Sequence, residues 1–302
     1  YSVSQPSLTD NITAKALSIS GAVANNKAYD RTTTATVDFT GASLNGVISP
    51  DTVTINSSSY TANFDTKNVG TGKTVTVSAV TLAGADAGNY TVSQPNLTAN
   101  ISALNLTISG AVANNKTYDR TTTATVNFTG ALLNGVISPD AVTIDSTGYS
   151  ANFDTKNVGN SKAVTVTGVV LSGTDAGNYT VSQPSLTANI TAKALSISGA
   201  VANSKTYDRA TTATVSFTGA SLVGVITPDA VNIDSSGYTA NFDTKDVGNT
   251  KPVTVGGVVL SGADAGNYSV SQPSGLTANI TAKDLTISGA VASNKTYDGN
   301  TT

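Results

Sequence analysis

Apolar and polar side chains alternate in short runs along the whole chain. Leu106 and Ile108 have one parity, and Thr107 and Ser109 have the other. A period of two places such apolar residues on one face of a half-buried strand. The same alternation recurs in Ala124, Val126 and Phe128; in Tyr149, Ala151 and Phe153; in Val164 and Val166; in Tyr179 and Val181; and in Leu186, Ala188 and Ile190. Clusters of Gly, Pro, Asn and Asp separate the runs, so the pattern predicts an all-β domain of about seven to eight short strands.

The chain is internally repeated. A stretch that begins at Asn25 returns at Asn114 and again at Asn203, and its central tyrosine recurs every 89 residues, as Tyr29, Tyr118 and Tyr207. The next equivalent, Tyr297, follows after 90 residues, because Gly275 is inserted in the preceding copy. Such a period is too long for a solenoid coil and is the size of one small sandwich domain. The sequence therefore predicts separate domains in tandem.

The connections between these domains are short. We predict units at 16–104, 105–193 and 194–283, with the end of a preceding unit at 1–15 and the start of a following one at 284–302. Only Thr191 to Ala194 separate the last apolar strand of one unit from the first of the next, and no Gly/Ser-rich linker occurs there. The predicted fold is a tandem array of immunoglobulin-like β-sandwich domains of about 89 residues that forms a semi-rigid rod.

A tyrosine follows a tight turn near the end of each unit. In the second copy the turn reads Asp175-Ala176-Gly177-Asn178-Tyr179. This arrangement predicts a tyrosine corner, in which the ring packs inward and the hydroxyl bonds to upstream backbone. Gly177 is expected to supply a positive φ angle, which a residue with a Cβ disfavours.

The residue composition removes several kinds of chemistry. The chain lacks His, Cys, Met and Trp, and all 19 acidic residues are Asp. It therefore has no imidazole base, thiol nucleophile, disulfide or zinc site. The net charge is −3, and Lys and Arg form no basic stripe, which argues against nucleic-acid binding. No apolar run approaches the ~20 residues of a membrane-spanning helix.

The remaining candidates for catalysis are carboxylates, and these occur singly in or beside turns. Asp is a common turn residue, whereas paired-acid catalysis needs two carboxylates at a fixed separation in a cleft. We therefore predict that the chain is not an enzyme, and we assign no catalytic, cofactor-binding or metal-binding residue. In the second unit these turn aspartates are Asp119, Asp140, Asp145, Asp154 and Asp175.

Calcium ions and internal isopeptide bonds are two devices that stiffen extracellular β-sandwiches. Calcium needs about six to eight oxygen ligands, and turn function explains the scattered aspartates better than a calcium site does. An internal Lys–Asn isopeptide bond needs a desolvated amine beside a buried acid. Lys116, Lys156 and Lys162 lie in polar strings, which predict solvated loops. We therefore expect no cofactor, with calcium and the isopeptide bond kept as open alternatives.

Two motifs carry a family resemblance. Lys116-Thr117-Tyr118-Asp119 and Gly177-Asn178-Tyr179-Thr180 resemble the YDG-type repeats, and the similar MBG-type repeats, of large bacterial surface adhesins of the filamentous-haemagglutinin kind. The likeness covers the whole chain. It departs at the glycine of the YDG motif, which is replaced in the full copies by Arg31, Arg120 and Arg209 and kept only as Gly299. If the turn requires a glycine conformation, the arginines need a slightly different turn.

The resemblance implies a secreted or surface-anchored array, outside the cell or on the surface of a bacterium. We expect a structural stalk or extracellular fibre segment whose partners are neighbouring repeats of the same chain, with lateral self-association as a further possibility. One alternative is an adhesive module that binds a glycan or a cell receptor through the repeats. A second alternative is a self-associating filament component.

Overall fold

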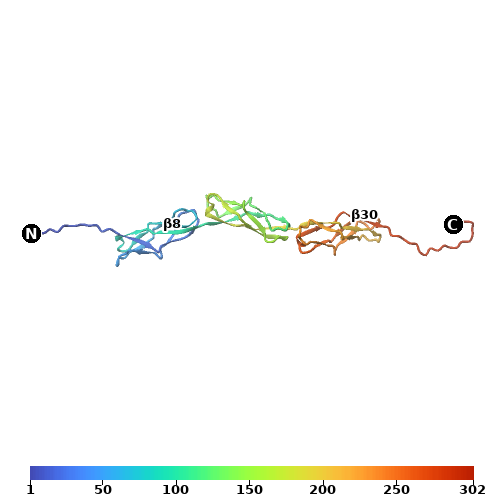
Figure 1. The fold of residues 1–302 in the computed structure, drawn as a ribbon, viewed down its shortest axis with the longest axis horizontal. Coiled ribbons are helices and arrows are strands. Elements are labelled where there is room, and N and C mark those ends of the chain that lie inside the picture. Colours follow the sequence, from blue (N-terminus) through green and yellow to red (C-terminus); the bar gives the residue numbers. More distant parts are fainter. The chain divides into compact units, whose positions relative to one another are not determined.

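The computed structural model describes all 302 residues and consists of β-strands and loops (Figure 1). It contains no α-helix, and its only helical segments are three single 3₁₀ turns, η1 (Ala87–Asn89), η2 (Ala176–Asn178) and η3 (Ala265–Asn267). The same succession of elements occurs three times. The predicted all-β class and the tandem repetition are therefore confirmed. No helix is long and apolar enough to cross a membrane.

Each copy contains eleven strands, rather than the seven to eight predicted. The first copy contains β1 (Lys15–Ser20), β2 (Val23–Ala24), β3 (Lys27–Ala28), β4 (Val37–Asp38), β5 (Ser43–Asn45), β6 (Thr54–Asn56), β7 (Thr61–Phe64), β8 (Gly70–Ser78), β9 (Thr81–Ala83), β10 (Tyr90–Ser93) and β11 (Asn96–Ser102). The second contains β12 (Leu104–Ser109), β13 (Val112–Ala113), β14 (Lys116–Thr117), β15 (Val126–Asn127), β16 (Leu132–Asn134), β17 (Thr143–Asp145), β18 (Ser150–Phe153), β19 (Gly159–Thr167), β20 (Val170–Ser172), β21 (Tyr179–Ser182) and β22 (Ser185–Thr191). The third contains β23 (Lys193–Ser198), β24 (Val201–Asn203), β25 (Lys205–Thr206), β26 (Thr214–Ser216), β27 (Ser221–Val223), β28 (Asn232–Asp234), β29 (Thr239–Phe242), β30 (Gly248–Gly256), β31 (Val259–Ser261), β32 (Tyr268–Ser271) and β33 (Leu276–Thr281). Several of the additional strands have two or three residues, too few to show a period of two.

The first copy shows how the strands are paired. A three-stranded sheet has the order β10-β1-β5, a four-stranded sheet has the order β3-β11-β8-β7, and β2–β4 and β6–β9 form separate pairs. The pairs β1–β10 and β3–β11 are parallel, whereas the other pairs are antiparallel. The third copy has the equivalent orders, β27-β23-β32 and β25-β33-β30-β29. Each of these copies thus departs from a purely antiparallel sandwich at two parallel pairs, which join strands from its beginning and its end.

The apolar residues of the alternating pattern form the core. Leu106, Ile190 and Val164 are 0%, 1% and 2% exposed, while residues of the other parity are mostly exposed. Burying one such side chain contributes about 1.5–3 kcal/mol. The predicted faces of these strands are therefore confirmed.

The chain divides into two compact units, and the division runs through the second copy. One unit comprises Tyr1–Ala113, Thr125–Asn152 and Val164–Leu186, and the other comprises Asn114–Ala124, Phe153–Ala163 and Thr187–Thr302. In the first unit, one hydrophobic cluster contains the core of the first copy together with Leu106 and Tyr179 of the second. Apolar packing therefore continues from one copy into the next.

The connections between copies are shorter than predicted. Ser102 ends β11 and Leu104 begins β12, so Ala103 is the only residue between them. Ala192 is likewise the only residue between β22 and β23. A single connecting residue leaves little conformational freedom between the strands that it joins.

Candidate functional site

A buried carboxylate lies where the first copy meets the second. The side chain of Asp140 is 1% exposed. Its Oδ2 atom accepts hydrogen bonds from the Tyr29 hydroxyl at 2.8 Å and from the Tyr179 hydroxyl at 2.7 Å, and its Oδ1 accepts one from Arg31 Nε at 2.6 Å. Tyr29 and Arg31 belong to the first copy, whereas Asp140 and Tyr179 belong to the second. We call these four residues the first junction site.

The same arrangement recurs where the second copy meets the third. Asp229, also 1% exposed, accepts from Tyr118 at 2.8 Å, from Tyr268 at 2.7 Å and from Arg120 Nε at 2.5 Å. The tyrosine rings pack edge to face in both sites, with centroids 5.3 Å apart in the first and 5.4 Å in the second. Tyr118, Arg120, Asp229 and Tyr268 form the second junction site.

A second polar contact crosses each junction. The Asn178 side chain is buried, and its Oδ1 accepts a hydrogen bond from the backbone N–H of Val69 at 3.0 Å. Asn267 accepts from the N–H of Val158 at the same distance. In the first copy the equivalent Asn89 is exposed. Burial of this asparagine therefore accompanies the presence of a preceding repeat.

The turn of the Tyr-Asp-Arg segment is held by its aspartate. Asp119 Oδ1 accepts hydrogen bonds from the backbone N–H and hydroxyl of Thr121, and from Lys116 Nζ at 2.7 Å. The ammonium group of Lys116 also lies 5.6 Å from the centre of the Phe153 ring. Asp119 is thus a turn residue, as predicted, and its turn fixes Tyr118 and Arg120 on either side.

A second aspartate holds the loop that carries Asp140. Asp175 Oδ2 accepts a hydrogen bond from the N–H of Ala141 at 3.0 Å, and the N–H of Asp175 donates to the Ala141 carbonyl. Because Asp175 also precedes η2, the Asp140 loop and the turn before Tyr179 are tied together. Contacts within the second copy therefore position both the Asp140 carboxylate and its partner Tyr179, without any contact from the first copy.

The arginines occupy the backbone conformation that the sequence led us to expect only for glycine. Arg31, Arg120 and Arg209 have φ angles of 67°, 68° and 73°, and Gly299 has 75°. The expectation of a different turn is therefore wrong: the turn is the same. A non-glycine residue in this region costs about 1–2 kcal/mol, and the ion pair with the buried carboxylate offsets that cost for Arg31 and Arg120.

Electrostatics keep the junction carboxylates ionised. Burial alone would raise the pKa of Asp140, but the hydrogen bonds from Tyr179, Tyr29 and Arg31 outweigh it and hold the pKa below its ordinary value. The same balance lowers the pKa of Asp229. Burial and the adjacent carboxylate raise the pKa of Tyr29, so its hydroxyl stays protonated as a donor. Three donors thus satisfy each carboxylate, which suits a structural connector.

Two expectations about the tyrosine turn have different outcomes. Tyr179 is buried, and its hydroxyl accepts a hydrogen bond from the backbone N–H of Ile137 at 3.2 Å, so the predicted contact with upstream backbone is confirmed. The positive φ expected for Gly177 is wrong, because Gly177 lies within η2 and is not left-handed. A 3₁₀ turn makes the tight turn without that conformation.

The lysines predicted to lie in solvated loops include two that are largely buried. Lys116 is in β14 with its side chain 16% exposed, and Lys162 is in β19 with 11% exposed. Lys162 Nζ lies 2.8 Å from Asp154 Oδ1. These amines are therefore held in ion pairs against strands, and the expectation of solvation is wrong for them.

The other aspartates remain dispersed. No group of three or more acidic side chains comes together in a way that could hold a metal ion. Asp145 Oδ1 accepts from the N–H and hydroxyl of Thr147, as expected for a turn residue. The sequence predicts that Asp140 is an ordinary turn aspartate, but the structure places its side chain in a buried site. In the sequence, Asp140 and Asp229 each end a Ser/Thr-Pro-Asp segment that follows a Tyr-Asp-Arg segment of the preceding repeat.

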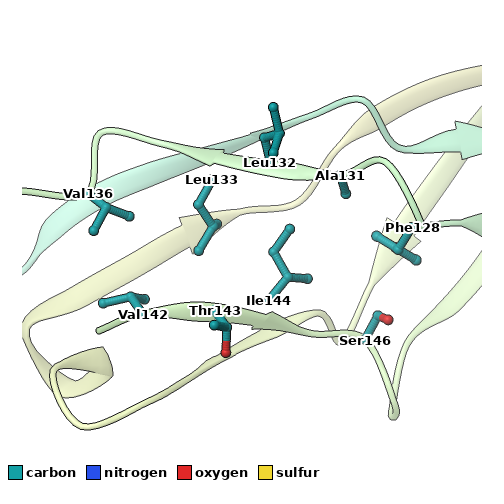
Figure 2. Close-up of a pocket in the computed structure, with 9 residues that line it drawn as sticks. All are labelled: Phe128, Ala131, Leu132, Leu133, Val136, Val142, Thr143, Ile144 and Ser146. Atoms are coloured by element: carbon teal, nitrogen blue, oxygen red, sulfur yellow. The ribbon is translucent and has the colours of Figure 1, made fainter. Parts of the chain in front are cut away.

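An apolar groove lies beside each copy. In the second copy it has a volume of about 470 Å³ and runs between β16 and β17, with Leu133 and Ile144 directed into the space (Figure 2). Equivalent grooves occur beside Leu44 and Ile55 and beside Leu222 and Ile233. No charged side chain lines any of them, and nothing in the structure indicates an occupant.

Comparison with known proteins gives a family match over most of the chain. Residues 13–98, 102–187 and 191–275 each match the family model described as the YDG domain. No curated protein matches the chain. Among solved structures, the crystal structure of Drosophila N-cadherin EC1-4 is similar at 8% identity, covering 89% of this chain and 75% of that one, with a TM-score of 0.27.

The left-handed arginines provide a matched test of the junction. R120G relieves backbone strain but removes the ion pair with Asp229, and breaking a buried pair costs about 3–5 kcal/mol. R209G relieves the same strain without removing an ion pair within the chain. We expect urea unfolding to show R120G destabilised by about 1–4 kcal/mol and R209G stabilised by about 1–2 kcal/mol. Equal stabilisation of both variants would contradict the assigned role of Arg120.

The lowered pKa values of Asp140 and Asp229 predict a dependence of stability on pH. A carboxylate with a depressed folded-state pKa stabilises the fold above its unfolded-state pKa, and this contribution is lost as the pH falls through the folded-state value. We expect a constant melting temperature above about pH 5 and a decrease below about pH 4. The D140N/D229N variant should have a lower melting temperature than the unmodified chain at neutral pH. Its melting temperature should fall less than that of the unmodified chain when the pH is lowered. An unchanged acid dependence in that variant would contradict the assignment.

Proposed function

The chain belongs to the YDG domain family, and from that premise we propose that it is a structural stalk or extracellular fibre segment of a bacterial surface protein. Its role is to extend from or connect surfaces, not to catalyse a reaction. Its direct partners are neighbouring repeats of the same long chain. It acts outside the cell or at the cell surface.

The recurring junction site is the observation that carries this proposal. A spacer transmits position only if adjacent repeats keep a fixed orientation. Each junction combines a single connecting residue, a buried carboxylate with three donors and a buried asparagine contact. These restraints act at separate points, so together they oppose both bending and twisting between copies.

The surfaces of the repeats give the adhesive alternative less support. Carbohydrate-binding sites commonly present exposed aromatic rings, because a ring has an apolar face and Tyr and Trp add a polar end. Within the three copies the aromatic side chains are buried or half-buried. The strongly exposed aromatic residues, Tyr1 and Tyr297, lie outside these copies. The polar faces of the strands carry mainly Thr, Ser and Asn. This composition favours a spacer over a binding module.

Small-angle scattering of the dilute chain tests the proposed stalk. Three sandwich domains of about 35–40 Å each, joined end to end, predict a maximum dimension above ~100 Å. A compact particle of ~40–60 Å would contradict it. A D140N/D229N variant should keep folded repeats but show a broader distribution of dimensions. The matched control is D51N, which changes the equivalent aspartate of the first copy outside either junction site and should scatter like the unmodified chain.

A further inference from the structure

We propose that each copy is a mechanical clamp, in which parallel pairing between its first and last segments resists tension along the chain. The inference rests on the proposed function, because only a chain held at both ends carries a load. In a tandem array the load enters each copy at its first strand and leaves it at its last. β11 continues through Ala103 into β12, and β22 continues through Ala192 into β23, so little slack separates one copy from the next.

The first and last segments of the first copy are paired in the same direction. Residues 15–28, the entry segment, contain β1 and β3, and residues 90–102, the exit segment, contain β10 and β11. β1 pairs with β10 in parallel, and further along the same two segments β3 pairs with β11 in parallel. The paired residues are Lys15↔Tyr90, Ala16↔Thr91, Leu17↔Val92, Ser18↔Ser93, Lys27↔Ile101 and Ala28↔Ser102.

Further hydrogen bonds join the two segments beside the paired strands. β11 departs from its regular register with β8 at Asn100, and the N–H of Asn100 donates to Asn26 Oδ1 at 2.7 Å. Just after β3, the N–H of Tyr29 donates to the Ser102 carbonyl at 2.9 Å. Both contacts recur in the other copies, the first as Asn189 with Asn115 and Asn279 with Ser204, and the second as Tyr118 with Thr191 and Tyr207 with Thr281.

Tension along the chain pulls the entry and exit segments past each other. The load acts on the beginning of the entry segment and on the end of the exit segment, which are opposite ends of a parallel pair. The hydrogen bonds between the segments are therefore stressed at the same time. Two parallel strands that are pulled apart from a shared end would instead lose these bonds one after another. The rate of unfolding, which governs resistance to force, should therefore be low for tension along the chain.

The loaded strands are also held by their other neighbours and by the core. β1 lies between β10 and β5, and β11 lies between β3 and β8. Leu17 of β1 and Ile101 of β11 are each 1% exposed, so sliding either strand also draws an apolar side chain out of the core. In the third copy β23 lies between β27 and β32, and β33 lies between β25 and β30. The same two parallel pairs recur there, between β23 and β32 and between β25 and β33.

Single-molecule force spectroscopy with two pairs of attachment points tests the clamp. The chain has no cysteine, so two introduced cysteines define where it is pulled. T191C/K283C places the attachment points beside the beginning of β23 and the end of β33, which loads the third copy along its segments. T206C/K283C places them at the shared end of a parallel pair, because Thr206 is paired with Thr281. At the same pulling speed, the T191C/K283C chain should unfold at the higher force.

A triple variant tests the recurring side-chain contact between the segments. N26A/N115A/S204A removes the acceptor that joins the entry segment to the exit segment in each copy. At a constant force applied to the two ends of the chain, each copy of this variant should unfold about 2–10-fold faster than in the unmodified chain. That change corresponds to the loss of one hydrogen bond.

The matched control is D38A/N127A/S216A, which removes one acceptor of a turn N–H per copy outside the paired segments. It should unfold under load at nearly the rate of the unmodified chain, and a thermal melt of each variant reports its folding. Equal unfolding forces for the two pairs of attachment points would overturn the proposal, as would equal acceleration of the two triple variants under load. Scattering from the unloaded chain tests the stalk separately, so an extended chain that unfolds at the same force in both geometries would reject this inference alone.

Discussion

The structure depends on a charge that is removed from water at each junction. A buried carboxylate is costly unless its hydrogen bonds and its charge are both satisfied. Asp140 meets that requirement only when a tyrosine and an arginine of the preceding copy join a tyrosine of its own copy. Correct placement of one copy on the next is therefore a condition for burying the charge. The junction therefore fixes the orientation of the two copies in addition to holding them together.

The rest of each copy presents the parts of this site at the right places. Turns held by Asp119 and Asp175 fix the segments that carry Arg120 and Tyr179. Apolar packing adds to this, because Leu106 and Tyr179 belong to the hydrophobic cluster of the first copy. The chain has few charges, and it places individual ion pairs where they fix the orientation of one copy against the next. The polar faces of its strands carry mainly Thr, Ser and Asn.

Much of the fold could be predicted from the sequence, because the alternation of apolar and polar residues and the repetition of segments can both be read from the order of the residues. Burial of Leu106 and Ile190 follows from parity, and the tyrosine corner follows from the turn before Tyr179. The junction site could not be derived in this way. Asp140 is separated from Tyr29 by more than one repeat, and an aspartate after Ser-Pro has a sufficient local explanation as a turn residue. The sequence shows only that arginine replaces the glycine of the YDG motif, and the structure adds that this arginine has a left-handed φ and a buried carboxylate as its partner.

We infer that adjacent copies are coupled through the buried carboxylate. A double-mutant cycle with R120Q, D229N and the double variant measures this coupling directly, since it subtracts the separate effect of each substitution on stability. The account predicts a coupling free energy of about 2 kcal/mol or more from equilibrium unfolding. Additive effects, with a coupling energy near zero, would contradict it.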